Sequence, residues 1–251
     1  MREEMTVRSH NPVLSRRDTF GTPTAATLEE MYSAPQRMTI DDVVGKTALL
    51  LGILSVTAAA SWVLELYALA FPAAIVGFVL ALVLTFKREP SPGLTIAYAA
   101  IEGVFLGAVS RLFDEAYPGI AVQAIGGTIL CFGAVLWAYK SGRLRATPRF
   151  KKVITIAMMS IFALYMVNLL VSLFGVDAFG FIRDSGPVGI LFSVFVVSIA
   201  ALSFVLDFDM IEDAERHGVP EKFAWKAAFG LVVGLVWLYL ELLRLLSKLR
   251  D

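Results

Sequence analysis

Cysteine and histidine are scarce in this chain. Among 251 residues there are one cysteine, Cys131, and two histidines, His10 and His217. A single cysteine can form no intramolecular disulfide and supplies no thiolate metal set. Neither histidine stands at metal-site spacing from a second ligand, and the sequence shows no nucleophile–base arrangement. We therefore expect no resident cofactor and no enzymatic activity.

Net charge is also lacking, because 22 basic residues balance 22 acidic ones. The sequence therefore gives no global electrostatic argument for a nucleic-acid partner. The first forty residues lack the apolar stretch of a cleaved signal peptide and are polar, with many Pro, Ser and Thr. We expect residues 1–40 to be a disordered cytoplasmic tail. Thr39, followed by Asp41 and Asp42, predicts a helix start.

Long apolar runs dominate the rest of the chain. Hydrophobic residues make up 57 % of the sequence and the mean hydropathy is +0.72, far more than a soluble domain needs. The runs are about twenty residues long, which suits helices that cross a hydrocarbon core roughly 30 Å thick. We predict an all-α polytopic membrane protein in which residues 41–251 form a bundle of seven transmembrane helices. The predicted spans are Val43–Val63, Tyr67–Phe86, Leu94–Phe113, Ile120–Tyr139, Val153–Phe174, Pro187–Phe208 and Gly230–Leu249.

Lysine and arginine placement predicts the orientation. With the N-terminus in the cytoplasm, 17 of the 22 basic residues fall in cytoplasmic segments. The multi-pass protein is therefore expected in a bacterial inner membrane with a cytoplasmic N-terminus. Seven crossings then put the C-terminus outside, and the basic end with Arg244, Lys248 and Arg250 argues against that. The conflict would be relieved if one apolar run were re-entrant.

Three carboxylates interrupt the apolar runs: Glu102, Asp207 and Glu241. A charged side chain at the centre of a membrane helix costs about 2.5–3.5 kcal/mol on insertion scales, so each is a candidate functional residue. Glu102 is followed by Gly103 and Gly107, whose spacing lets another helix approach closely. Glu102 is then expected to face the bundle interior or to be protonated. Asn168, in the fifth run, is expected to form a hydrogen bond between helices.

Asp207 and Glu241 can meet only if the last helix starts late. If a flat interfacial segment precedes Gly230, Glu241 lies eleven residues past that start, and Asp207 lies eleven residues before Gly218. At about 1.5 Å per residue the two carboxylates are then at similar depth in antiparallel helices. If the helix instead begins at Pro220, Glu241 lies far deeper than Asp207 and the pairing fails.

Two carboxylates close together in a low dielectric cannot both ionise cheaply, so they tend to share a proton. Their repulsion can also be relieved by a hard cation, and calcium tolerates loose carboxylate geometry. Asp209 and Asp213 could add oxygens at the cytoplasmic mouth. Simpler interpretations remain open: Asp207 and its acidic neighbours cap a helix end in water, or Glu241 pairs locally with Arg244 three residues later.

Several short motifs resemble the transmembrane Bax inhibitor motif family, in its bacterial branch, over about residues 43–250. They are Glu102-Gly103, Leu206-Asp207-Phe208-Asp209-Met210-Ile211, and Leu238-Tyr239-Leu240-Glu241 followed by Leu-Leu-Arg-Leu-Leu. The resemblance implies a pH-sensitive calcium leak channel with a two-aspartate site on the last two helices, and animal members are linked to suppressing cell death. Asp207 would match the first aspartate and Glu241 the second, with one extra methylene. Lys87 and Arg88 are candidates for the family's arginine in the second helix.

These observations predict a pH-sensitive cation channel, for calcium above all, gated by Asp207 and Glu241. Its partners would be the lipid bilayer, calcium and protons, with no nucleic acid. One alternative is a non-transporting regulatory or scaffold protein that binds a membrane protease or another membrane complex. In that case the tail and the basic loop from Lys140 to Lys152 would carry the function. Another alternative is a proton-coupled carrier of a small solute.

Overall fold

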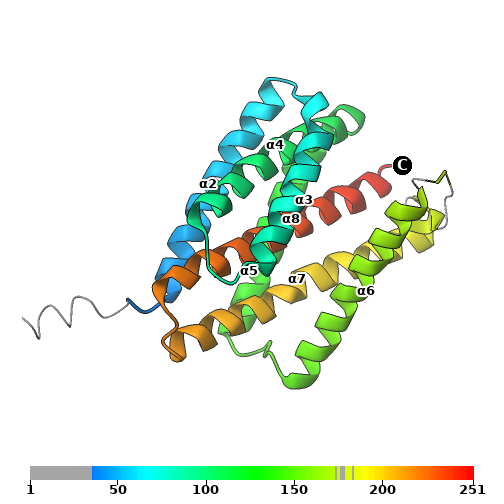
Figure 1. Ribbon diagram of the computed structural model, residues 1–251. Coiled ribbons are helices and arrows are strands. Elements are labelled where there is room, and N and C mark those ends of the chain that lie inside the picture. Colours follow the sequence, from blue (N-terminus) through cyan, green and yellow to red (C-terminus); the bar gives the residue numbers. More distant parts are fainter. Residues whose placement is uncertain (1–35, 173, 176–178, 183) are drawn as a thin grey trace, which may run out of the picture. The chain divides into compact units, whose positions relative to one another are not determined.

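The computed structural model describes residues 36–172, 174–175, 179–182 and 184–251. In these residues the chain forms seven long helices and three short 3₁₀ turns, and an isolated bridge between Arg37 and Pro220 is the extent of β pairing (Figure 1). The long helices are α2 (Ile40–Val63), α3 (Ala70–Phe86), α4 (Pro92–Ala116), α5 (Ile120–Lys140), α6 (Pro148–Ser172), α7 (Pro187–Arg216) and α8 (Ala224–Lys248). The 3₁₀ turns are η2 (Tyr67–Leu69), η3 (Gly180–Ile182) and η4 (Glu221–Phe223).

All seven long helices, α3 and α8 taken with the turns that precede them, are long and apolar enough to cross a membrane. This confirms the predicted all-α polytopic fold. The helices also cover the predicted apolar runs. Several of them are longer than predicted by a polar turn at one end, because a helix continues into water until a helix-breaking residue ends it. Pro72 lies in the first turn of α3, where a missing N–H costs least.

The predicted helix start at Thr39 is confirmed. The Thr39 hydroxyl accepts a hydrogen bond from the Asp42 N–H while the Asp42 carboxylate accepts one from the Thr39 N–H, so two free backbone donors are satisfied reciprocally. Just before it, the Met38 N–H donates to the Val219 carbonyl at 2.8 Å. Residues 1–35 of the predicted tail, which spans residues 1–40, lie outside the described part of the chain. In the rest of it Arg37 pairs with Pro220, Met38 is buried and α2 begins at Ile40.

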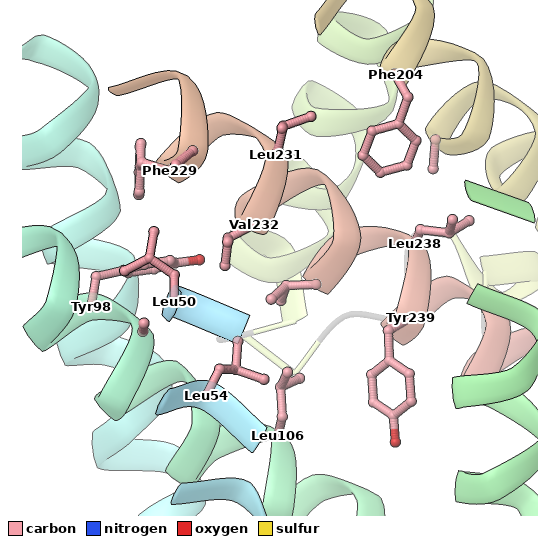
Figure 2. Packing of buried hydrophobic residues seen from close by; sticks show 14 of the residues in the cluster. Leu50, Leu54, Tyr98, Leu106, Phe204, Phe229, Leu231, Val232, Leu238 and Tyr239 are labelled. Atoms are coloured by element: carbon pink, nitrogen blue, oxygen red, sulfur yellow. The ribbon is translucent and has the colours of Figure 1, made fainter. Parts of the chain in front are cut away.

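Helix α8 is the centre of the bundle. It packs against α2, α4, α5 and α7, and Figure 2 shows its Leu231, Val232 and Leu238 among side chains of α2, α4 and α7. Small residues along α8, such as Ala224 and Ala228, are fully buried. By contrast α6 packs mainly on α7, and only about a tenth of its most apolar stretch is buried within the protein.

Helices α2 and α4 make the closest contact. A β-carbon at Gly103 would collide with the Leu54 carbonyl and the Thr57 hydroxyl of α2, and one at Gly107 would collide with the Ala58 carbonyl. The glycine pair therefore allows the close backbone approach that its spacing predicts. Gly230 and Gly234 in α8 have the same spacing of four residues but different surroundings. Gly230 has open space around it, whereas Gly234 lies against the ring of Phe204 in α7.

The boundaries of the last two helices correct the sequence-based prediction. Helix α7 continues to Arg216, and Gly218, with φ of +65°, begins the turn. Helix α8 then begins at Ala224 and runs unbroken past Gly230 to Lys248. The segment expected to lie flat is thus the first two turns of α8. Its buried side, Ala224, Ala228 and Phe229, continues the apolar stripe of the helix, and nothing after Pro220 breaks it.

The long helices run alternately between two ends of the bundle. At the end where α8 begins, Lys46 pairs with Glu221 and Lys222 with Glu89. At the end where α8 finishes, Arg111 pairs with Glu65, and the Lys248 ammonium donates to the Gly189 carbonyl of α7. We refer to these as the α8-start end and the α8-finish end.

The basic C-terminal side chains all have partners in the protein. Arg244 pairs with Glu241, Lys248 donates to Gly189, and Arg250 donates to the Pro118 carbonyl and to Gln123. These contacts hold the end of α8 against α7 and α5.

Candidate functional site

Asp207 lies on the buried stripe of α7. Ser203 and Ile211, one turn away on either side, are both buried, and Asp207 itself is half-buried. Among the described residues its carboxylate has neither a hydrogen-bond partner nor a basic partner. Next to it, Phe204 and Phe208 stack on each other and meet the edge of Phe132 from α5. Asp207 thus lies next to the aromatic packing between α7 and α5.

Among the described acids Glu241 is the most enclosed, with 1 % of its surface exposed. Arg244 Nη1 lies 2.8 Å from both of its carboxylate oxygens, the Tyr165 hydroxyl of α6 donates to Oε2 at 3.1 Å, and Trp237 Nε1 donates to Oε1 at 3.2 Å. Arg244 Nη1 also donates to the Tyr165 hydroxyl, and its guanidinium lies over the Tyr165 ring. This local pairing three residues apart is the simpler alternative that the sequence left open, and Tyr165 extends it into a link between α8 and α6.

Asp207 and Glu241 lie at different levels of the bundle. A β-carbon at Gly234 would lie 2.9 Å from the ring of Phe204, so these two residues of the antiparallel α7 and α8 are level. Asp207, three residues beyond Phe204, is then level with Leu231. Glu241 lies ten residues further along α8, about 15 Å away along the axis. The late helix start on which a shared site depends is absent, since α8 begins at Ala224.

Glu102 lies at nearly the same level as Asp207 but beside another helix. The Tyr98 and Phe229 rings are in contact, 5.1 Å apart, and Ser110 is hydrogen-bonded to Tyr239, which places Glu102 level with about Val232 of α8. The Glu102 carboxylate is directed to α3, where a β-carbon at Gly77 would lie 2.6 Å from Oε2. Glu102 is 8 % exposed and, like Asp207, has no hydrogen-bond or ion-pair partner in the described part of the chain.

The other candidate residues lie at the α8-start end. Asp209 pairs with Lys151 of α6, and exposed Asp213 lies 3.5 Å from the ring nitrogen of His217. Lys87 and Arg88 are exposed at the end of α3, and the Lys87 carbonyl accepts from Lys226. In the described residues, no three His, Cys, Asp or Glu side chains gather as a metal-ion site.

Tyr165 and Trp237, which both donate hydrogen bonds to Glu241, were not predicted as site residues from the sequence. Trp237 stands one helical turn before Glu241, so its spacing alone suggests a contact. Tyr165 is a hydroxyl in an apolar run, and this signal marks a buried polar group without saying which helix it meets. The partner of Tyr165 depends on how α6 is placed against α8, which residue spacing within one helix does not give.

Comparison with known proteins gives one assignment. A family model described as Bax inhibitor 1 like matches residues 11–251, so the match covers all seven helices and also much of the N-terminal segment. A search of curated proteins found no match. The matched region is nearly the whole chain, and the helices it covers are those of a multi-pass membrane protein. The chain belongs to the Bax inhibitor 1-like family.

Proposed function

We propose that the protein is a pH-sensitive cation leak channel of a bacterial inner membrane, with calcium as the principal permeant ion. The observation that carries this proposal is Asp207, a carboxylate inside the bundle with no partner in the described residues. An uncompensated charge at this depth is expensive. It must be neutralised by a proton or balanced by a cation, which is what a proton-sensitive cation pathway requires.

Calcium enters the proposal as the permeant ion rather than as a resident cofactor. Oxygen ligands in loose geometry suit it, and a site with one free carboxylate binds weakly enough to release the ion again. The acidic side chains Asp209, Glu212 and Asp213 continue from Asp207 to the α8-start end. They would concentrate cations there, although Lys151, Arg216 and His217 partly offset their charge.

In this proposal Glu241 does not share a proton with Asp207 but has a separate role. Its charge holds Arg244, and through Tyr165 it ties α8 to α6. Loss of the Glu241 charge would leave Arg244 without its counter-charge and would loosen this tie. The charged groups around Glu241 are Arg244 and, further along α8, Lys248. Asp207 would then be the ion site, and the pair of Glu241 and Arg244 would be a latch between α8 and α6.

The proposed orientation puts the α8-start end in the cytoplasm. The basic loop between α5 and α6 and the basic residues at the end of α3 lie at this end, as does Arg216 at the end of α7. Basic segments remain preferentially on the cytoplasmic side. The C-terminal residues Arg244, Lys248 and Arg250 count against this orientation, but 17 of the 22 basic residues support it.

Calcium flux through the purified chain in liposomes, measured from acidic to neutral pH, tests the proposal. Asp207→Asn keeps the shape of the side chain but cannot titrate, so we expect it to flatten the pH profile. Glu241→Gln should raise flux at neutral pH by roughly five-fold, the change that corresponds to about 1 kcal/mol. Glu65→Gln is the control, because Glu65 is exposed and pairs with Arg111 at the bundle surface.

Flux that is the same at every pH in wild type and in both variants would remove the mechanism. Absence of flux in a folded wild-type protein would favour the regulatory or scaffold function instead. A proton current that saturates with an added solute would favour the proton-coupled carrier.

A further inference from the structure

A polar cavity lies between α6 and α8 at the α8-finish end. Its volume is about 410 Å³. Seven of its nine lining residues carry a polar group, and about half of its surface is apolar; the residues are Tyr165, Asn168, Leu169, Ser172, Ile182, Arg244, Ser247, Lys248 and Asp251. Apolar side chains would be expected between two loosely packed membrane helices, so this lining calls for a polar occupant.

Two cations line the cavity, and in the described residues Lys248 has no direct ion pair, with Glu241 and Asp184 acting on it only from further away. Lys248 is 4 % exposed, and its ammonium donates to the Gly189 carbonyl at 3.0 Å. It has no carboxylate within ion-pair distance in the described part of the chain. Gly189 is the third residue of α7, so the positive end of that helix dipole adds to the Lys248 charge. A buried ammonium in this position is costly unless an anion balances it.

The second cation, Arg244, is only partly used. All of its hydrogen bonds within the described residues come from Nη1, which binds Glu241 and Tyr165. Nη2 and Nε are left without a partner there, and the side chain is 37 % exposed. A guanidinium with two unused nitrogens, which carry three N–H groups, matches the oxygens of a phosphate.

Asn168 supplies a neutral donor. It was expected to hydrogen-bond between helices, but among the described residues it has no hydrogen-bond partner and instead lines the cavity. The Ser172 and Ser247 hydroxyls donate to carbonyls of their own helices. The carboxylate in the lining, Asp251, accepts from the Tyr117 and Ser185 hydroxyls and so is satisfied by neutral donors. The unused groups of the cavity are therefore the donors.

We propose that this cavity binds a phosphate group, held by Lys248, Arg244 and Asn168. The phosphate can belong to the headgroup of an anionic phospholipid or to a free phosphate ion. Both present the same oxygens to the same donors, and the two sources differ in whether acyl chains accompany the group.

Lipid retention on the purified full chain tests the site. The protein is delipidated in detergent and incubated with phosphatidylglycerol or phosphatidylcholine, and retained lipid is measured by native mass spectrometry. We expect the wild type to keep phosphatidylglycerol, and Lys248→Met and Asn168→Leu each to lower retention at least five-fold. Asn168→Leu removes no charge, so it tests the cavity without the folding risk of removing a buried cation. Arg111→Gln, a cation at the same end but outside the cavity, is the matched control.

Inorganic phosphate separates the two sources. Phosphate that binds the wild type by calorimetry and displaces phosphatidylglycerol supports a free ion as the occupant. Retention of phosphatidylglycerol that phosphate cannot displace supports the lipid headgroup. The proposal is overturned if neither probe binds, or if binding is equal in wild type, Lys248→Met and Asn168→Leu. An equal loss in Arg111→Gln would also overturn it, because surface charge alone would then explain the binding.

Discussion

The acids inside this bundle have different surroundings, although each is a carboxylate in an apolar helix. Glu241 has an arginine one turn away and two neutral donors. Glu102 is directed to the bare backbone at Gly77, and Asp207 has no partner in the described residues. A paired acid contributes to a fixed structure, whereas an unpaired one is left free to exchange protons or ions. This difference separates the latch from the ion site in the proposed mechanism.

Breaking the Glu241–Arg244 pair should destabilise the protein. In Glu241→Gln the guanidinium of Arg244 keeps Tyr165 but loses its counter-charge. Removing one partner of a fully buried pair costs about 3–5 kcal/mol. Arg244 is 37 % exposed, so we expect about 1–3 kcal/mol after solvent screening. Thermal unfolding in detergent measures the loss. Glu65→Gln, which breaks an exposed pair, should cost less than about 1 kcal/mol, and equal unfolding curves for both variants would contradict this account.

At the residue scale the sequence indicated which acids lie inside the bundle but not what each one contacts. Apolar surroundings single out Glu102, Asp207 and Glu241 because the cost of charge in a membrane needs only local composition. The Arg244 partner is also local, since residues three apart share a helix face. Tyr165 and Gly77 come from other helices, and no pattern within one helix specifies them.

Among the helix pairs, α2 and α4 depend most directly on single residues. The helices approach so closely at Gly103 and Gly107 that any side chain there meets backbone of α2. Gly103→Ala should therefore destabilise the protein by about 1–3 kcal/mol, as overpacking does. Gly126→Ala in α5 is the matched control, because no atom lies within 4 Å of its β-carbon position. Alanine stabilises a helix by about 1 kcal/mol relative to glycine. The control variant should therefore be as stable as the wild type, or more stable, in the same unfolding assay.

The end of α8 is held by a pH-sensitive contact outside the membrane-spanning helices. Hydrogen bonds donated by Tyr117 and Ser185 hold the pKa of Asp251 below its ordinary value. A lowered pKa in the folded state means that the contact contributes fully above the unfolded value, about 3.9, and is lost as pH falls through the folded value. A spin label at Leu249→Cys, in a Cys131→Ala background, should become mobile in that acidic range.

The same label in Asp251→Ala should be mobile at all pH values, and in Asp251→Asn its mobility should not follow pH. A label at Val56, on the exposed side of α2, controls for general acid unfolding. A Leu249 label that stays immobile in acid while Asp251→Ala frees it would show that protonation does not break the contact.

At the element scale, the interpretation of α8 from sequence was wrong for an identifiable reason. Charged and aromatic residues alternate after Pro220, and this composition is typical of a membrane interface. The charged side chains instead reach neighbouring segments, with Lys222 on Glu89 and Lys226 on the Lys87 carbonyl. Contacts within the protein therefore satisfy the charged side chains that a membrane interface would otherwise have satisfied, and the helix begins earlier. The earlier start contributes to moving Glu241 away from the level of Asp207.

Seen over the whole molecule, length and hydropathy were enough to predict the seven helices. Each span is an apolar run of nearly fixed length, and the membrane thickness that sets this length is common to all of them. The arrangement of the helices was harder to predict, because membrane helices pack through small residues and a few polar contacts instead of a hydrophobic pattern. The central position of α8 follows from such contacts with α2, α4, α5 and α7.

The proposed orientation makes a prediction for the whole molecule that labelling can test. In a Cys131→Ala background, Arg143→Cys lies in the basic loop at the α8-start end, and Pro118→Cys lies at the α8-finish end. Both sites are exposed. In intact inner-membrane vesicles of cytoplasm-inside orientation, an impermeant maleimide should label Pro118→Cys at once and Arg143→Cys only after permeabilisation, because the basic segments remain in the cytoplasm. The reverse order would put the basic loop outside and would place the acidic residues from Asp209 to Asp213 on the outer side of the proposed cation pathway.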